Sequence, residues 1–173
     1  LMYAIGVNGV SYWEETERAG RQLHEAFSEL KPGRHGETRA ARIVEAIRWV
    51  PPGKEDAVLT ETREIEVYDP KPFGATVLSW STRLEAPKSG GGVELGGSHY
   101  YGLGARFLVS MDKDGTFLSS DGKEGDIVRG DERLTFARWC AYQAQADGKP
   151  VTIAMFDLPA NPRPALWFTM GTP

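Results

Sequence analysis

Three long runs with the character of β-strands follow one another in the first half of the chain. They cover residues 38–50, 57–68 and 76–84. Glu64-Ile65-Glu66-Val67 in the second run alternates charged and apolar side chains, as a half-buried strand does. Pro51-Pro52-Gly53 and the proline-containing segment Asp69–Gly74 separate the runs. Long strands joined directly by proline- and glycine-rich turns indicate an antiparallel sheet.

The rest of the sequence predicts more strands, and it contains a single segment that is compatible with a helix. Strands are expected at residues 1–8, 105–111, 116–118, 134–144, 151–157 and 166–170, with a tight turn at Asn8-Gly9 and a hairpin around residues 147–150. Gln22–Leu30 is compatible with a helix or a strand, and Lys31-Pro32-Gly33 is expected to end it in either case. This series of strands implies a large antiparallel β-sandwich or a barrel.

The length of the chain, 173 residues, suits one domain or a large piece of one. Ala86–Gly92 is either an interdomain linker or a solvated loop, and the strand patterns that resume directly after it favour the loop. The sequence opens on Leu1 and ends on Gly171-Thr172-Pro173, so we expect a fragment truncated at both ends. The compartment therefore stays open.

Composition excludes several classes of protein. The net charge of −4 and the absence of a Lys/Arg cluster argue against a general nucleic-acid binder. No apolar run approaches the roughly 20 residues that cross a bilayer. The single cysteine, Cys140, permits no intrachain disulfide, and its strand-like surroundings predict a buried, inert thiol.

Metal and nucleophile signatures are missing from the sequence. The three histidines, His24, His35 and His99, have no metal-ligand spacing, so neither a metal nor a cofactor is expected, and His35 is interpreted as a solvated loop residue. No G-x-S-x-G motif occurs. Gly102-Leu103-Gly104 lacks the strand–turn–helix context of a dinucleotide site.

Two turn-rich segments carry the polar and aromatic groups that carbohydrate recognition needs. Gly96–Phe107 holds His99, Tyr100, Tyr101 and Arg106 among glycines, before an expected strand. The second segment, Asp157–Pro164, is stiffened by three prolines and presents Asp157, Asn161 and Arg163. The alternatives are a backbone-bonded loop histidine, a surface or ion-paired arginine, and a purely structural Asx/Pro turn.

Several segments resemble one bacterial family, whose members often carry the label methane oxygenase PmoA or PmoA-like domain of unknown function. The resemblance rests on residues 6–13, 102–107, 137–142, 148–151 and 155–163 and covers almost the whole chain. It implies a galactose-mutarotase-like supersandwich that binds sugars on one sheet. It also implies a histidine-rich segment before Leu1 and further strands after Pro173. Many members have histidine where this chain has Leu158. Methane oxygenation is not expected, because that chemistry belongs to proteins with membrane-spanning helices.

We therefore expect residues 1–173 to form a single partial PmoA-like β-sandwich domain that acts on, or binds, a small-molecule carbohydrate. As an enzyme, it would use His99 as a general acid/base and Arg106 to bind a carboxylate or hydroxyl oxygen. The expected substrate-binding residues are Tyr100, Arg138, Asp157, Asn161 and Arg163. The alternative is a non-catalytic sugar-binding or scaffold module. The reaction and the oligomeric state stay open.

Overall fold

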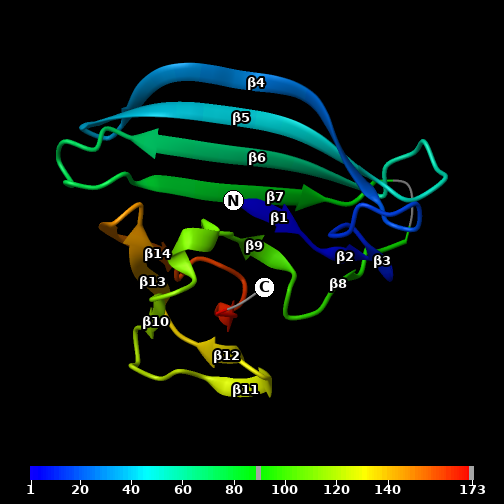
Figure 1. Ribbon diagram of the computed structural model, residues 1–173. Helices are drawn as coiled ribbons and strands as arrows, with labels where there is room; N and C mark the ends of the chain where they lie inside the picture. Colours follow the sequence, from blue (N-terminus) through cyan, green and yellow to red (C-terminus); the bar gives the residue numbers. More distant parts are fainter. Residues whose placement is uncertain (89–90, 172–173) are drawn as a thin grey trace. The chain divides into compact units, whose positions relative to one another are not determined.

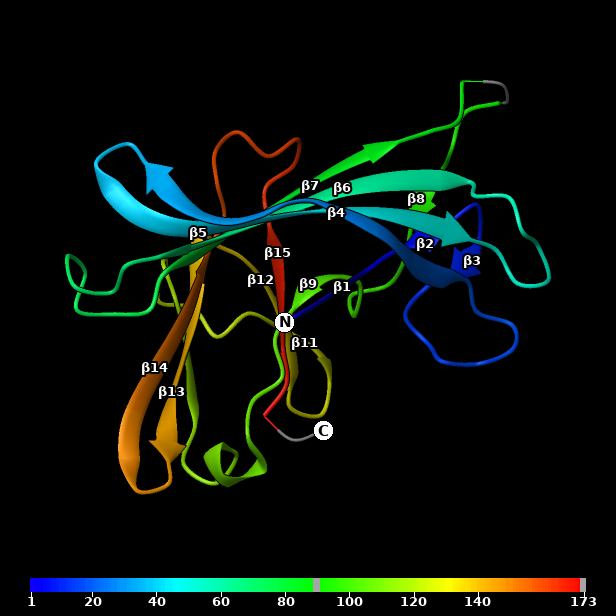
Figure 2. The ribbon, with the colours of Figure 1, turned by 90° about the horizontal axis from the view of Figure 1, so that it is seen from above.

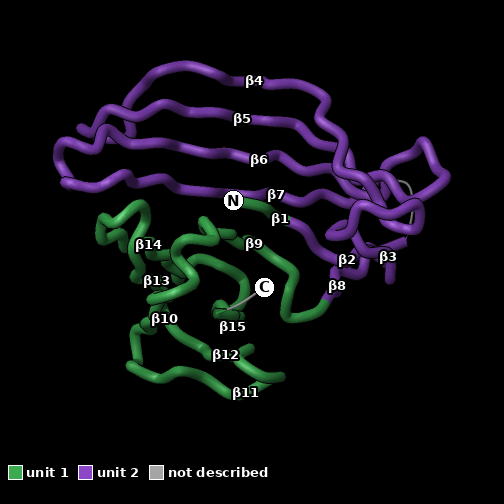
Figure 3. Tube along the Cα trace, in the orientation of Figure 1, with its two compact units in different colours: residues 1–3, 98–173 green, residues 4–97 purple. Residues whose placement is uncertain are grey.

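Strands account for almost all the regular structure in the computed structural model, which describes residues 1–88 and 91–171. The strands pair in antiparallel sheets, which confirms the predicted fold class and is consistent with a β-sandwich. The chain forms two compact units, residues 4–97 (unit 2) and residues 1–3 with 98–173 (unit 1) (Figure 3). The single domain over residues 1–173 stays a prediction.

The three predicted long runs form the centre of unit 2. With the segment before them they build a four-stranded antiparallel meander of β4 (Arg21–His35), β5 (Thr38–Val50), β6 (Leu59–Tyr68) and β7 (Leu78–Glu85) (Figure 1). The bounds of β5 are those predicted, and β6 and β7 lie within two residues of theirs. Pro51 follows β5 directly, as expected of a residue that cannot donate a ladder hydrogen bond.

The segment with two possible structures, Gln22–Leu30, is part of strand β4. The register with β5 shifts between His24 and Ala26 and again between Phe27 and Glu29, so β4 contains two irregularities of the bulge type. They break the alternation of its sequence. The expectation that Lys31-Pro32-Gly33 ends the element is wrong. Pro32 is paired within β4, which is an edge strand, and edge strands tolerate a proline although it cannot donate a ladder hydrogen bond.

A smaller sheet in unit 2 has the order β3-β2-β8, formed by β2 (Gly6–Val7), β3 (Val10–Ser11) and β8 (Leu95–Gly96). The predicted Asn8-Gly9 turn is confirmed. Both residues have positive φ, 50° and 77°, as a type I′ hairpin turn requires. Asn8 also bonds Glu94 twice: the Asn8 N–H donates to the Glu94 carbonyl (2.9 Å), and Asn8 Oδ1 accepts from the Glu94 N–H (2.9 Å).

Unit 1 contains shorter strands in three sheets. β1 (Met2–Ala4) pairs with β9 (Gly102–Gly104); β10 (Thr116–Ser119), β13 (Trp139–Ala146) and β14 (Lys149–Phe156) form a second sheet; β11 (Asp126–Arg129), β12 (Glu132–Phe136) and β15 (Leu166–Thr169) form the third. The predicted hairpin is β13–β14, a long two-stranded ribbon in Figure 2.

Two strand predictions in unit 1 are wrong. Residues 105–108 do not pair in a sheet, and Val109–Met111 is a 3₁₀ turn. The apolar side chains of this run pack individually instead: Phe107 stacks on Tyr142 with centroids 5.0 Å apart, and Met111 is buried. The run 134–144 belongs to two strands in different sheets, because the chain changes sheet at Ala137-Arg138.

Each unit has its own core. In unit 2 the fully buried Trp49 packs against Tyr12, with ring centroids 5.0 Å apart. In unit 1 the buried cluster is Met111, Tyr142 and Ala144. Cys140 is buried, as predicted, and burial raises the pKa of its thiol; the predicted inertness of this thiol stays a prediction.

In the described part of the chain, no helix has the length and apolar character needed to cross a membrane. The predicted loop at residues 86–92 lies partly outside the described residues.

Candidate functional site

The best-formed site candidate in unit 1 centres on the carboxylate of Glu132. Glu132 begins β12 and pairs with Arg129 at the end of β11, across a tight turn in which Gly130 has φ 56°. A residue with a side chain rarely adopts this left-handed conformation, so glycine suits the turn. The hairpin places Arg129 beside the Glu132 carboxylate.

Two donors hold one oxygen of this carboxylate. The Tyr100 hydroxyl donates to Glu132 Oε1 at 2.7 Å, and Arg129 Nη2 donates to the same oxygen at 2.6 Å. Only 3% of Glu132 is exposed. No hydrogen bond from the described residues reaches the other oxygen, Oε2. A carboxylate oxygen can accept more than one hydrogen bond, so Oε2 has capacity for an incoming donor.

Three rings pack against one another, and one of them, Tyr100, bonds this carboxylate. His99 contacts Tyr100 and Phe168, with ring centroids 4.6 and 4.8 Å apart, and Tyr100 contacts Phe168 at 4.7 Å. Phe168 is positioned by the pairing of β15 with β12, in which it faces Leu134. His99, Tyr100, Arg129, Glu132 and Phe168 are called the Glu132 cluster below.

Hydrogen bonding fixes the charge states in the Glu132 cluster. The bonds from Tyr100 and Arg129 lower the pKa of Glu132, so it is an anion at neutral pH. The bond to the carboxylate raises the pKa of the Tyr100 phenol, which stays protonated, and Glu132 also raises the pKa of Arg129. The cluster therefore combines a stable anion, two fixed donors and aromatic ring surface.

The predicted residues of the proline-rich loop form a separate group. Asn161 Nδ2 donates to Asp157 Oδ1 at 2.6 Å, and the Ala165 N–H donates to Asp157 Oδ2 at 2.9 Å. These bonds lower the pKa of Asp157. The Asp157 N–H donates to the Arg138 carbonyl at 2.8 Å. Both oxygens of Asp157 thus fix the loop, as in the structural alternative. The role of Asp157, Asn161 and Arg138 in binding stays a prediction.

The remaining predicted arginines, Arg106 and Arg163, are exposed, and no ion pair or hydrogen bond holds either guanidinium within residues 1–88 and 91–171. No hydrogen bond, ion pair or ring contact among the described residues joins Arg106 to His99. Of the predicted site residues, the structure therefore brings together His99 with Tyr100, and Asp157 with Asn161 and with the backbone of Arg138.

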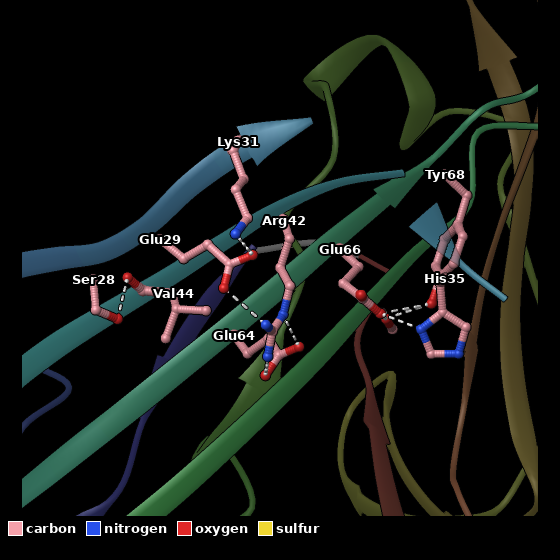
Figure 4. A network of polar contacts seen from close by, with 10 residues as sticks. Ser28, Glu29, Lys31, His35, Arg42, Val44, Glu64, Glu66 and Tyr68 are labelled. Atoms are coloured by element: carbon pink, nitrogen blue, oxygen red, sulfur yellow. Dashed lines mark hydrogen bonds and ion pairs between the residues drawn. The ribbon is translucent and has the colours of Figure 1, made fainter. Parts of the chain in front are cut away.

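A polar network in unit 2 covers one face of the β4–β7 sheet (Figure 4). Arg42 lies between two carboxylates, with Nη1 2.8 Å from Glu29 Oε2 and Nε 2.6 Å from Glu64 Oε1. Glu66 Oε2 accepts from the Tyr68 hydroxyl at 2.9 Å and lies 3.0 Å from His35 Nδ1. The interpretation of His35 as a loop residue is wrong, because it ends β4 and contacts Glu66 on β6.

A buried carboxylate occupies the opposite face of the same sheet. Glu61 Oε1 accepts from Arg63 Nε (2.8 Å) and the Thr82 hydroxyl (3.0 Å). Glu61 Oε2 accepts from Trp49 Nε1 (2.9 Å) and Arg63 Nη2 (3.0 Å). The Arg63 guanidinium also lies 5.0 Å from the Trp80 ring centroid. With both oxygens of Glu61 occupied, this network is structural.

The described residues contain no group of three or more His, Cys, Asp or Glu side chains that could hold a metal ion.

Sequence reasoning missed Glu132, Arg129 and Phe168. Arg129-Gly130-Asp131-Glu132 has the composition of an exposed turn, and no local signal marks Glu132 as buried. The only hint in the sequence was a pair of opposite charges, Arg129 and Glu132, on either side of a glycine turn. The pair lies in the same half of the chain as the His99-Tyr100 segment.

Residues 3–173 match a family described as a family of unknown function (DUF6807). Neither a curated protein nor a solved structure matches the chain. The expected relationships to the PmoA-like family and to galactose-mutarotase-like proteins are not addressed by these comparisons and stay predictions.

Proposed function

The chain belongs to the DUF6807 family, whose function is unknown, and we propose that it binds a carbohydrate at the Glu132 cluster. The observation that carries the proposal is the buried Glu132 carboxylate, with two donors on Oε1 and none from the described residues on Oε2, together with the three packed rings that include its donor Tyr100. Glu132 Oε2 is not among the buried polar atoms that lack a partner, and a ligand hydroxyl would use its remaining acceptor capacity.

The cluster matches the two surfaces of a sugar. Sugar hydroxyls donate to carboxylates, and charge-assisted hydrogen bonds of this type are about twice as strong as neutral ones. The C–H face of a sugar ring packs on aromatic rings, of which Tyr100, His99 and Phe168 offer three. Tyr100 and Arg129 hold the carboxylate in one orientation before the ligand arrives, which reduces the entropy lost on binding.

The protonation states favour binding over acid catalysis by Glu132. A catalytic carboxylic acid needs a raised pKa, and the pKa of Glu132 is lowered by Tyr100 and Arg129. A lowered pKa also makes the carboxylate a weak base. Glu132 is thus suited to accept a hydrogen bond rather than to transfer a proton.

Ligand-induced thermal stabilisation tests the proposal. The 173-residue chain would be melted with a panel of mono- and disaccharides, including oxidised sugars. A ligand at about 100 times its Kd stabilises the fold by about 2.7 kcal/mol, or roughly 5–10 °C in Tm. Glu132→Gln should weaken the affinity at least about tenfold, because a hydrogen bond to a charged acceptor is lost.

Further variants distinguish a loss of sugar binding from a loss of folding. His99→Ala removes ring surface and Tyr100→Phe removes one donor, and both should weaken the same ligand. Glu124→Gln is the matched control, since Glu124 is an exposed carboxylate in the same unit. A sugar that binds Glu132→Gln and His99→Ala as tightly as the original chain would refute this site.

A catalytic function is the second candidate, and it rests on the imidazole of His99 beside the rings of Tyr100 and Phe168. His99 would act as a general acid/base on the bound sugar, with Arg106 as the expected oxygen ligand. Product analysis with His99→Ala and Arg106→Ala tests this assignment. Full turnover in both variants would leave binding as the function.

A further inference from the structure

Unit 2 contains a groove with a volume of about 470 Å³, at the end of the sheet where β4 begins and β5 ends. Its lining residues are Arg21, Leu23, Arg48, Val50, Lys54, Glu55 and Asp56. The volume falls within the range of roughly 300–1,000 Å³ that small-molecule sites occupy. All the lining residues belong to unit 2, so the groove is separate from the Glu132 cluster of unit 1.

The sheet register builds the floor and the first wall. Arg21 pairs with Val50, and Leu23 pairs with Arg48, so these four side chains project from one face of β4 and β5. Val50 is 1% exposed and Leu23 half-buried, which makes an apolar floor. Arg21 is exposed beside it.

The loop between β5 and β6 forms the second wall. Lys54 N–H donates to the Pro51 carbonyl at 3.2 Å, and Arg48 Nη1 donates to the Glu55 carbonyl at 3.1 Å. Pro51 and Pro52 fix their own φ angles, so the loop that carries Lys54, Glu55 and Asp56 is stiff. Its three charged side chains are exposed.

The charges in the groove are only partly compensated within the protein. Arg48 Nε lies 2.5 Å from Oε1 of Glu25, the extra residue at the first irregularity of β4, so Arg48 has its counter-ion. Arg21 and Lys54 have no ion pair in the described part of the chain, and the carboxylates of Glu55 and Asp56 have none either. The groove thus presents two free cations and two free carboxylates above an apolar floor.

We propose that this groove binds a small polyhydroxylated carboxylate, such as a hexuronate. The guanidinium fork of Arg21 and the ammonium of Lys54 suit a carboxylate. Glu55 and Asp56 accept hydroxyl hydrogen bonds, and Leu23, above the buried Val50, packs against the C–H face of the ligand. A bare inorganic anion would use the cations and leave the carboxylates and the floor unused. This site goes beyond the proposed function and does not depend on it.

Calorimetric titration of the 173-residue chain with sodium glucuronate tests the proposal. Glucose serves as the neutral probe and inorganic phosphate as the anion probe. Arg21→Ala and Lys54→Ala should each weaken glucuronate about tenfold, because each removes a charge-assisted hydrogen bond. Both residues are exposed, so these variants should melt like the original chain.

Matched controls separate this groove from other charges and from the Glu132 cluster. Arg83→Ala removes another exposed arginine of the same sheet and should leave the glucuronate affinity unchanged. Arg21→Ala should leave unchanged the affinity for a sugar whose binding Glu132→Gln weakens, because Arg21 belongs to unit 2 and Glu132 to unit 1. The proposal is overturned if glucuronate does not bind at about 10 mM, if glucose or phosphate binds as tightly, or if Arg83→Ala weakens binding as much as Arg21→Ala.

Discussion

Replacing Glu61 by glutamine tests directly whether the buried polar network around Glu61 stabilises unit 2. The substitution keeps the shape of the side chain and removes its charge. In the folded protein Glu61 is 2% exposed, and each of its two oxygens accepts two hydrogen bonds. An amide has one oxygen and one NH₂ group. In either orientation of the glutamine, its NH₂ group takes the place of an oxygen that accepted hydrogen bonds, and so it faces donor groups of Trp49, Arg63 or Thr82.

The size of the effect follows from these contacts. At least one N–H donor loses its acceptor in either orientation. Arg63, with a side chain only 15% exposed, loses its nearest counter-ion and keeps Glu45, whose Oε2 lies 3.9 Å from Arg63 Nη1. Breaking a buried ion pair by removing one partner costs about 3–5 kcal/mol. Hydrogen bonds to charged groups are worth about 1.5–3 kcal/mol each, so two lost bonds give the same order. We expect Glu61→Gln to destabilise unit 2 by about 3–5 kcal/mol.

Urea unfolding monitored by tryptophan fluorescence measures this loss, because Trp49 lies in the same network. With a slope of about 2 kcal/mol per molar, the midpoint should fall by about 1.5–2.5 M. Glu85→Gln is the matched control in the same sheet, since Glu85 is 51% exposed and pairs with an exposed arginine, and it should cost at most about 1 kcal/mol. If Glu61→Gln unfolds within about 1 kcal/mol of the original chain, the network does not hold unit 2 together.

Three further predictions concern unit 1. Gly115→Ala should cost about 2–4 kcal/mol in urea unfolding, because its Cβ would overlap the buried Tyr142 side chain and displace the bond from the Tyr142 hydroxyl to a carbonyl. Gly33→Ala, whose Cβ meets nothing within 4 Å, should be close to neutral, and equal losses would contradict the reasoning. The pKa of Glu132 is lower in the folded than in the unfolded chain, so its ionisation adds stability above the unfolded value of about 4.3, and this contribution is lost as the pH falls through the folded pKa. The Tm difference between the original chain and Glu132→Gln should therefore shrink from about pH 6 to about pH 3, and a difference independent of pH would count against the paired anion. Cys140, with its raised pKa, should react with iodoacetamide only after unfolding, and rapid labelling of the folded chain would show that its thiol is accessible.

The strands that could be predicted from the sequence are those whose pairing is local. β5, β6 and β7 follow one another along the chain through the loops 51–58 and 69–77, so their alternation and the prolines between them are visible directly in the sequence. β4 was ambiguous because two irregularities shift its side-chain pattern. The strand predicted after Gly104 is wrong for another reason. Apolar residues there pack into the core without pairing in a sheet, and the sequence pattern does not distinguish a buried strand from such a buried irregular segment.

The candidate site was predictable only in part. Glycine-rich surroundings identified His99 and Tyr100, which lie in the Glu132 cluster. Glu132 could not be found in this way, because its burial and its bond to Tyr100 depend on a contact across 32 residues of sequence. Arg106 failed to join His99 because the expected strand that would have oriented it does not form.

The paired hydrogen bonds between Asn8 and Glu94 bear on the order in which unit 2 folds. They close a loop of 86 residues, whose closure entropy amounts to about 4 kcal/mol, while each hairpin of the β4–β7 meander closes a short one. Non-local contacts of this kind form late in folding. We therefore expect the β4–β7 meander to form before β8 pairs with β2, and we expect this β2–β8 pairing to form last and to open first.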